Sequence, residues 1–479
     1  MSSSPPAGRE QPDRSPQPDP SHDAPGRPPR RSRPGGRRTR TPHPAQLTIA
    51  GFAVGVVLGT LLLVLPVAHR GPGAATALEA LFTATSALCV TGLIVVDTPV
   101  YWSGFGQVVI AVLIQAGGFG IMALASLLGV LVTRRLGLRQ QLVAQAETKT
   151  LGLGDVRTIL LGVARTSLVV EGVTAALLAA RFALGYGEPL PRAVWLGVFH
   201  AVSAFNNAGF ALYSDNVVGF ATDPWICLPL CAAVVLGGLG FPVLFELRRH
   251  LREPRRWSLH TKLTVLGTSA LLVLGPAFVL AAEWGNPGTL GRLSVPGKLL
   301  AGFFQGVMPR TAGFNSVDVA QMNTGTWLGT DVLMFIGGGS AGTAGGVKVT
   351  TFLVLLLVIV SEARGDDAVT AFGRSLPRGL QRQALSVALL GVAAVVLPSV
   401  LFALTTPFTL DQVLYEVVSA FATVGLSTGI TAQLPAAHQL VLVALMFIGR
   451  TGTITLAAAL ALRSRPRLYQ LPEERTIVG

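Results

Sequence analysis

The chain has 479 residues, of which 50% are hydrophobic and only 13% are charged, and its formal net charge is +13. Soluble domains carry about 25% charged residues, so the composition excludes an ordinary soluble protein and predicts an integral membrane protein with many spans. The three cysteines (Cys89, Cys227 and Cys231) form no disulfide framework, and no His, Asp or Glu accompanies them at ligand spacing. We therefore expect no transition-metal site.

The first segment, residues 1–45, contains twelve of the 31 prolines, nine arginines and almost no large apolar residues. Such a segment cannot bury enough apolar surface to offset the entropy that it would lose on ordering. We predict a disordered, solvated cytoplasmic tail, with contact to anionic lipid or to a partner as the alternative. Residues 466–479 are expected to form a cytoplasmic C-terminus.

After the tail, long and short apolar stretches alternate. Eight long stretches suit a membrane span of about 20 residues, near 46–68, 103–133, 158–184, 223–247, 262–283, 329–361, 383–405 and 438–462. A short apolar stretch lies inside each successive pair, at 75–88, 193–206, 298–308 and 411–422. The short stretches cannot span, and a glycine with polar residues follows each one, which is typical of a re-entrant helix and loop. The prediction is an all-α polytopic membrane protein with eight transmembrane helices.

Lysine and arginine are distributed unevenly between the two sides of this layout. With the N-terminus in the cytoplasm, cytoplasmic segments hold 28 Lys and Arg residues, and the outer loops hold only Arg70, Arg192, Arg292 and Lys298. The positive-inside rule expects such a bias. It predicts a multi-pass protein of the cell inner or plasma membrane with both termini in the cytoplasm. It also explains the basic composition without a nucleic-acid partner.

The four short stretches are alike. Read through the glycine that ends each, they are LFTATSALCVTG, FHAVSAFNNAG, FFQGVMPRTAG and YEVVSAFATVG, which end at Gly92, Gly209, Gly313 and Gly425. The spacings of 117, 104 and 112 residues indicate four repeats, with boundaries at 46–150, 151–257, 258–375 and 376–465. Each repeat crosses out and back in the same sense. The repeats are therefore parallel, around a pseudo-fourfold axis along the membrane normal.

Four symmetry-related loops suit the binding of a dehydrated cation. Such an ion needs several oxygen atoms at one depth, and glycine permits the backbone conformations that turn successive carbonyl groups toward a central axis. The re-entrant helices point their partly negative C-terminal ends at the same centre. Glycine that only allows close helix packing is the alternative, but four copies at near-equal spacing favour a pore.

A second glycine-rich stretch, FIGGGSAGTAGGVKVTT at 335–351, lies inside a long apolar segment and has six glycines in residues 337–346. A straight helix is unfavourable there, because each glycine costs about 1 kcal/mol relative to alanine. Gly337, Gly339 and Gly342 also match G-x-G-x-x-G, but no strand precedes them, so a nucleotide loop is disfavoured. We predict an irregular intramembrane plug. We expect more continuous second spans in the other repeats.

Several motifs resemble the Trk/Ktr/HKT family of potassium transporters, and in particular its bacterial KtrB/TrkH membrane subunits. They are VSAFATVGLSTG, AVSAFNNAGFAL, MPRTAGFNSVD, QAGGFGIM at 115–122 and MFIGRTGTITL at 446–456. The resemblance covers residues 46–465. It implies a potassium pathway made of four linked repeats, with one filter glycine in each. All four positions hold glycine here, as in potassium-selective members, whereas serine in the first would suggest sodium selectivity.

The resemblance also implies the site residues. The expected K⁺-binding filter comprises Val90, Thr91, Gly92, Asn207, Ala208, Gly209, Thr311, Ala312, Gly313, Thr423, Val424 and Gly425. The expected gate comprises Gly337, Gly338, Gly339, Ser340, Gly342, Thr343, Gly345, Gly346, Lys348 and the mid-span Arg450. Members of the family are homodimers that bind a cytoplasmic, nucleotide-binding regulatory ring of the KtrA/TrkA kind. We expect no cofactor in this chain, with K⁺ as the transported ion and membrane lipid as a partner.

Charged residues within apolar segments are expected to have roles near the pore. Arg450 is hypothesised to donate hydrogen bonds to carbonyl groups of residues 337–346 and to hold the pore shut, with a structural ion pair as the alternative. Arg310 should point away from the ion path, toward Asp318. Glu171 and Glu246 should pair with arginines or serve coupling ions. Asn207 should either coordinate ions or brace its loop.

Two other functions remain open at this point. A broken-helix solute transporter would use the glycine run to bind substrate, but that class usually has inverted repeats. An ion-translocating subunit of an ATP-driven potassium pump would also have a fourfold filter, although the chain lacks a P-loop. An enzyme is disfavoured because no nucleophile–base arrangement is evident.

Overall fold

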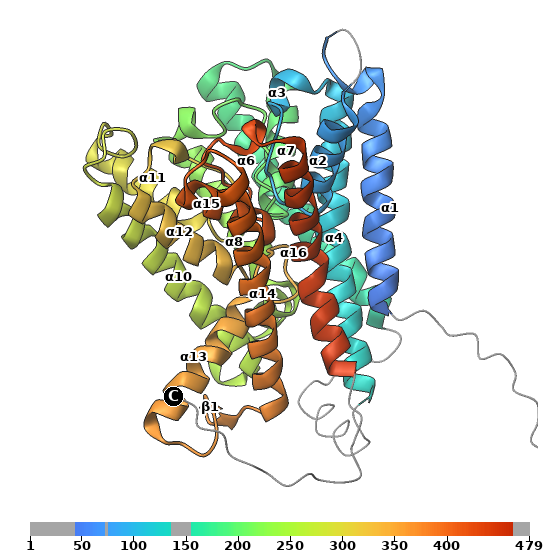
Figure 1. Cartoon of the computed structure of the whole chain (residues 1–479), viewed down its shortest axis with the longest axis vertical. Helices are drawn as coiled ribbons and strands as arrows, with labels where there is room; N and C mark the ends of the chain where they lie inside the picture. Colours follow the sequence, from blue (N-terminus) through green and yellow to red (C-terminus); the bar gives the residue numbers. More distant parts are fainter. Residues whose placement is uncertain (1–43, 72–74, 136–154, 463–479) are drawn as a thin grey trace, which may run out of the picture. The chain divides into compact units, whose positions relative to one another are not determined.

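The computed structural model describes residues 44–71, 75–135 and 155–462 of the chain (Figure 1). The predictions for the tail at 1–45 and for the terminus at 466–479 concern residues that lie almost entirely outside these ranges. The described residues are mostly helical.

The first two predicted repeats contain a similar succession of elements. Residues 44–135 form α1 (Pro44–Val64), the 3₁₀ helix η1 (Pro66–Ala68), α2 (Ala77–Leu88), α3 (Thr98–Tyr101) and α4 (Gly104–Arg135). Residues 155–256 form α6 (Asp155–Tyr186), α7 (Leu190–Phe205), η2 (Val218–Phe220), α8 (Pro224–Leu239), α9 (Phe241–His250) and η3 (Pro254–Arg256). In both, a short helix follows the first long helix.

The last two predicted repeats have the same order, and a small hairpin joins them. Residues 259–364 form α10 (Leu259–Glu283), α11 (Val295–Val307), η4 (Val319–Gln321), α12 (Thr324–Ile336) and α13 (Val349–Arg364). The antiparallel strands β1 (Thr370–Ala371) and β2 (Arg374–Ser375) follow. Residues 378–462 form α14 (Arg378–Thr405), α15 (Leu410–Phe421), η5 (Thr431–Gln433) and α16 (Ala436–Leu462).

Among the four short helices α2, α7, α11 and α15, two have a capping box at the start. A capping box starts α2, in which Thr76 Oγ1 accepts from the Glu79 amide and Glu79 Oε2 accepts from the Thr76 amide. Thr409 and Gln412 form the same arrangement at α15. Capping boxes satisfy amide groups that lack partners within the helix. Nearly all side chains in the C-terminal halves of the four helices are buried, so these helices end inside the protein.

Two of the second spans are broken, where the sequence predicted one. The predicted plug separates α12 from α13, as expected. The prediction of a continuous second span is wrong for residues 224–250, because α8 and α9 are bent by 100° at Gly240. Gly240 has a φ of +92°, a conformation that glycine adopts without steric cost.

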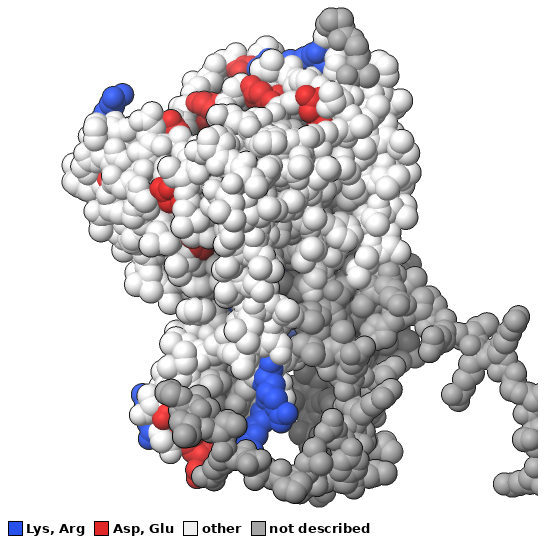
Figure 2. Space-filling view, viewed as in Figure 1, with Lys and Arg blue, Asp and Glu red and all other residues white. Residues whose placement is uncertain are grey.

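Length and hydropathy single out the helices that can cross a membrane. Among the described residues, α10, α14 and residues 160–186 of α6 meet both criteria, and the bent pair α8–α9 adds a fourth candidate. The described apolar parts of α1, α4 and α16 are shorter. Figure 2 shows a broad, largely uncharged zone on one face, with charged side chains of both signs toward each end. That zone suits contact with lipid.

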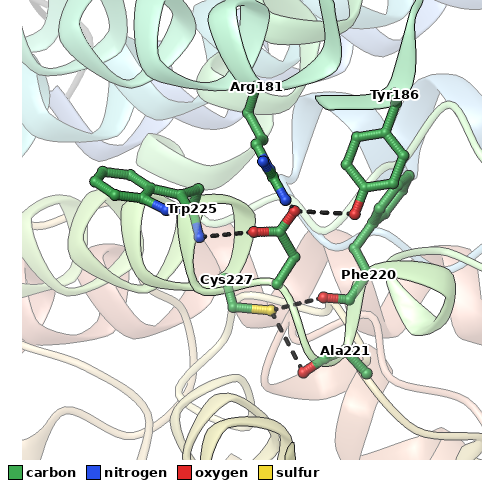
Figure 3. A network of polar contacts seen from close by, with 7 residues as sticks. Arg181, Tyr186, Phe220, Ala221, Trp225 and Cys227 are labelled. Carbon is green, nitrogen blue, oxygen red and sulfur yellow. Dashed lines mark hydrogen bonds and ion pairs between the residues drawn. The ribbon is translucent and has the colours of Figure 1, made fainter. Parts of the chain in front are cut away.

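A buried carboxylate joins two long helices at their ends (Figure 3). Asp223 caps α8 by accepting from the Trp225 amide at 2.9 Å. Its other oxygen accepts from Arg181 Nε at 2.6 Å and from the Tyr186 hydroxyl at 2.9 Å, both on α6. The Asp223 side chain is 5% exposed, whereas that of Arg181 is 39% exposed. One side chain thus caps one helix and holds a second.

We expect Asp223→Ala to lower the free energy of unfolding by about 1–2 kcal/mol, because it removes the N-cap of α8 and the acceptor that Arg181 and Tyr186 share. Unfolding in detergent micelles measures this loss. Asp215→Ala is the control, since the exposed Asp215 carboxylate accepts only from the Gly219 amide. Equal losses in the two variants would contradict the assignment.

Candidate functional site

The four predicted filter loops share one backbone conformation. In each, the glycine has a positive φ, between +71° and +96° at Gly92, Gly209, Gly313 and Gly425. The residue two positions earlier also has a positive φ, between +51° and +67° at Val90, Asn207, Thr311 and Thr423. Non-glycine residues seldom adopt this conformation. Its recurrence at the same place in four loops makes them structurally equivalent.

The four loops meet in cyclic order. A Cβ added to Gly92 would lie 3.3 Å from the Gly209 Cα, and one on Gly209 would lie 2.7 Å from the Gly313 Cα. A Cβ on Gly313 would lie 3.2 Å from the Gly425 Cα, and one on Gly425 would lie 3.0 Å from the Gly92 Cα. Each glycine is therefore adjacent to the next, and the last is adjacent to the first. The twelve predicted filter residues form one centre.

Serine hydroxyl groups hold two of these glycines. Ser86 and Ser419 are the serines of the shared Ser-Ala pair, and their Oγ atoms accept from the amides of Gly92 and Gly425 at 3.1 and 3.0 Å. Ser86 also donates to the Leu93 carbonyl at 2.7 Å. The equivalent Ser203 Oγ is buried and has no such partner. The Ser-Ala pair thus has a local structural role in two loops.

Backbone hydrogen bonds join the predicted plug to the break between α8 and α9. The amides of Gly339 and Thr343 donate to the carbonyls of Gly238 and Gly237, at 2.8 and 3.1 Å. The Phe241 amide donates to the Ala341 carbonyl at 3.3 Å. These backbone bonds give the irregular loop the partners that a helix would otherwise provide. The two broken spans therefore support each other.

The plug also contacts the filter loops. Thr343 Oγ1 donates to the Phe205 carbonyl at 3.2 Å and to Asn207 Oδ1 at 3.1 Å. The Gly345 amide donates to Thr311 Oγ1 at 3.3 Å, and a Cβ on Gly345 would overlap Thr423 Oγ1. Three of the four loops thus have a residue against the plug. The plug lies where the short helices end.

Asn207 braces its loop. Besides the bond from Thr343, its Nδ2 donates to the Arg310 carbonyl at 3.4 Å, so both side-chain polar atoms are engaged by protein. The side chain is 1% exposed. Of the two expectations for Asn207, the contacts favour bracing.

Two cationic side chains face the plug. Arg450 is 2% exposed, and its Nη1 donates to the Thr343 carbonyl while Nη2 donates to the Gly117 carbonyl at 3.4 Å. Lys348 Nζ donates to the carbonyls of Ala344 and Gly345, at 2.6 and 3.2 Å. Neither belongs to an ion pair among the described residues. Carbonyl oxygen atoms are therefore the protein groups that meet both charges.

The predicted partner of Arg310 is wrong. Arg310 points to α10, where its guanidinium donates to the Thr268 carbonyl at 3.4 Å and to Thr268 Oγ1 at 3.3 Å. Asp318 instead caps η4 by accepting from the Ala320 amide. Because η4 needs a cap, the carboxylate is already engaged within its own turn.

Arginine pairing is also wrong for Glu171 and Glu246. Glu171 Oε1 accepts from Ser167 and Asn206, at 3.1 and 3.2 Å. Glu246 accepts from the amide and hydroxyl of Ser258 and from the Thr261 hydroxyl. Amides and hydroxyl groups can satisfy a carboxylate without a cation. Such partners are harder to recognise in a sequence than an arginine in an apolar segment.

Three further glycines contact the site, and they are not among the glycines predicted from the sequence. A Cβ on Gly117, Gly237 or Gly449 would overlap the carbonyl oxygen of Leu88, Phe205 or Phe421, respectively. Each of these carbonyls lies four residues before a filter glycine. The signal was present as a glycine 24 to 28 residues after Gly92, Gly209 and Gly425. These glycines let the second spans touch the ends of the short helices.

The atoms that could bind a cation at this centre are neutral oxygen atoms. Within the described ranges, no group of three or more His, Cys, Asp and Glu side chains could hold a metal ion. Backbone carbonyls and threonine hydroxyls suit a weakly held monovalent cation better than a transition metal.

Comparison with known proteins identifies the family. The family model described as "TrkH: Cation transport protein" matches residues 36–466. The chain belongs to this family. The "Ktr system potassium uptake protein B" of Bacillus subtilis is 39% identical to this chain over 87% of this chain and 93% of that protein. Its namesake in Vibrio alginolyticus is 37% identical over 93% of this chain and 97% of that protein.

A further relative and a solved structure are also similar to this chain. The "Potassium/sodium uptake protein NtpJ" of Enterococcus hirae is 33% identical over 91% of this chain and 97% of that protein. The crystal structure of the potassium transporter TrkH from Vibrio parahaemolyticus matches with a TM-score of 0.65 and 20% identity, over 88% of this chain and 85% of that one. At that identity the match establishes the TrkH fold alone.

We expect Gly117→Ala to destabilise the protein by about 1–3 kcal/mol or more, because the new methyl group overlaps backbone rather than a flexible side chain. Gly172→Ala is the matched control, since nothing lies within 4 Å of its added Cβ. In α6 that change should be neutral or slightly stabilising. Thermal unfolding in detergent compares the two, and a Gly117→Ala protein as stable as the control would contradict the contact.

Proposed function

We propose that this chain is the pore-forming membrane subunit of a potassium uptake system. The observation that carries the proposal is the ring of four structurally equivalent glycine loops at the centre of the described residues. The membership of the TrkH family and the printed names of relatives at 37–39% identity support potassium as the ion.

The proposed filter consists of the twelve residues at 90–92, 207–209, 311–313 and 423–425. Carbonyl oxygens of the four loops replace the hydration shell of K⁺, and the positive φ values turn those carbonyls in a common direction. The filter glycines are essential because a side chain at any of them would collide with the adjacent loop. No cofactor takes part in this step.

The proposed gate is the plug at residues 337–346 together with Lys348 and Arg450. The plug is hydrogen-bonded to two filter loops and lies against a third, so we place it across the path that an ion takes after the filter. Arg450 holds it by a charge-assisted hydrogen bond to the Thr343 carbonyl. A cation at this point also repels K⁺ electrostatically.

The proposed setting is a plasma or inner membrane crossed by eight spans in four parallel repeats, with both termini in the cytoplasm. The chain acts as a homodimer in contact with lipid and binds a cytoplasmic, nucleotide-binding regulatory subunit. The word "system" in the names of the Bacillus and Vibrio relatives supports a multi-subunit assembly.

The proposal predicts selective cation flux into proteoliposomes. With the purified chain, K⁺ and Rb⁺ uptake should exceed Na⁺ and Li⁺ uptake by about tenfold or more, because a carbonyl filter favours the larger, less strongly hydrated ions. Radiotracer or fluorescence flux assays measure the ratio. The "Potassium/sodium" name of the Enterococcus relative makes Na⁺ the critical comparison. Equal K⁺ and Na⁺ flux would refute potassium selectivity.

The gate predicts the effect of Arg450→Ala. Removal of the guanidinium should raise K⁺ flux in the absence of a regulatory subunit by about tenfold, the effect of losing one charge-assisted hydrogen bond. Arg256→Ala is the control, because Arg256 is exposed and pairs only with the exposed Glu253. Unchanged or lower flux through well-folded Arg450→Ala protein would count against the latch.

A further inference from the structure

The backbone amide three residues after a filter glycine is bonded in the same way in three loops. These amides belong to Leu212, Ser316 and Thr428, which follow Gly209, Gly313 and Gly425. Each donates to a side chain of the short helix in its own repeat, eight or nine residues before the filter glycine. The three accepting side chains differ chemically, but their place in the repeat and their function as acceptors are shared.

In the second repeat the acceptor is a histidine. His200 Nε2 accepts from the Leu212 amide at 3.2 Å, and Nδ1 lies 2.7 Å from the Leu196 carbonyl. A carbonyl can only accept, so Nδ1 carries the proton and the ring is neutral. The side chain is 1% exposed, and the rings of Phe182 and Tyr213 surround it. One tautomer of a fully enclosed ring thus fixes the loop.

In the third repeat the acceptor is an amide. Gln305 Oε1 accepts from the Ser316 amide at 3.1 Å, and the Ser316 hydroxyl donates to the Ala301 carbonyl on the same helix at 3.0 Å. The Gln305 side chain is 1% exposed. This loop is therefore attached to α11 at two points.

In the fourth repeat the acceptor is a carboxylate. Glu416 Oε1 accepts from the Thr428 amide at 2.9 Å, and the hydroxyls of Ser427 and Thr431 also donate to the carboxylate. The side chain is 0% exposed, and the donors come from the segment immediately after Gly425. A buried carboxylate with several neutral donors holds the whole turn.

We propose that His200, Gln305 and Glu416 are positioning residues that set the selectivity of the filter. The inference rests on the proposed potassium pathway. Carbonyls distinguish K⁺ from Na⁺ only if they keep their positions around the ion. In three loops, a buried side-chain acceptor holds the backbone three residues after the filter glycine and so restrains that glycine. None of the three side chains needs to touch the ion.

The first repeat differs from the other three. Thr83 and Ala84 occupy the equivalent positions, and among the described contacts neither side chain accepts the Val95 amide. Its loop is held instead by Ser86, which accepts from the Gly92 amide and donates to the Leu93 carbonyl. The restraint therefore lies at the glycine itself in this repeat, and the described residues offer no side-chain acceptor to the Val95 amide.

The test compares acceptor-free and acceptor-retaining variants of the full chain in proteoliposomes, with the K⁺/Na⁺ flux ratio as the readout. Gln305→Met keeps the side-chain length and removes the oxygen. Glu416→Leu removes the acceptor from the fourth loop and leaves a side chain one atom shorter. We expect both to lower the ratio about tenfold by leaving a buried amide unmet. Glu416→Gln retains an acceptor for Thr428, so it should keep most of the ratio that Glu416→Leu loses.

The matched control is Gln412→Met. It makes the same chemical change as Gln305→Met, but in the first turn of α15, away from the filter loop. Gln412 closes the capping box with Thr409, so the variant loses helix stability but no contact with the filter loop. Its flux ratio should equal that of the wild type. Ratios lowered equally in Gln412→Met and Gln305→Met would overturn the inference in favour of general destabilisation.

The outcome for the wild type separates this inference from the proposed function. If the wild type does not prefer K⁺, the proposed function fails. If the wild type prefers K⁺ and Gln305→Met keeps that preference, only the positioning role fails.

A measurement on the wild type tests the same idea without any substitution. Hydrogen exchange should be slower for the amides of Leu212, Ser316 and Thr428 than for that of Val95, which has no side-chain acceptor among the described residues. Exchange of the three at the rate of Val95 would overturn the inference even if the variants fail to fold.

Discussion

The structure depends on one steric constraint: four loops approach so closely that their glycines have no room for a side chain. An added Cβ at Gly92, Gly209, Gly313 or Gly425 would strike the carbonyl or Cα of the adjacent loop. Such an approach requires four short helices that end at a common centre, which requires their C-terminal halves to be buried. It also requires glycines in three second spans, where Gly117, Gly237 and Gly449 admit the helix ends. The helical bundle is thus arranged around backbone contacts rather than around large side chains.

Neutral dipoles satisfy five charged side chains within the described helices and loops, whereas the buried Asp223 pairs with Arg181. Arg310, Lys348 and Arg450 donate to carbonyl and hydroxyl oxygens, and Glu171 and Glu416 accept from hydroxyls and amides. Burial of an ion pair is costly, and loss of one partner leaves the other uncompensated. A charged side chain that is held by backbone carbonyls can move to another carbonyl without leaving an oppositely charged partner unpaired. That property suits the gate proposed above, in which the plug forms and breaks its contacts.

Much of this arrangement was predictable from the sequence. The four short helices lie within three residues of the predicted bounds, because apolar length and the following glycine mark them directly. The interruption at 337–346 followed from glycine content, and Arg450 stood out as a charge within an apolar span. The bend at Gly240 was missed because residues 224–245 form one apolar run across it, and the bonds that stabilise the break come from a segment about one hundred residues away. The partners of Arg310 and Glu246 were missed for a similar reason: hydroxyls and carbonyls are too common in the sequence to point to one another.

The bonds between the plug and the α8–α9 break have a mechanical consequence. The Phe241 amide, in the first turn of α9, is bonded to the Ala341 carbonyl at the centre of the plug. The other end of α9 is basic, with Arg248, Arg249 and His250 in its last turn. One helix of ten residues thus joins a basic end to the backbone of the plug. A ligand that binds the basic end and shifts α9 would act directly on a hydrogen bond of the plug.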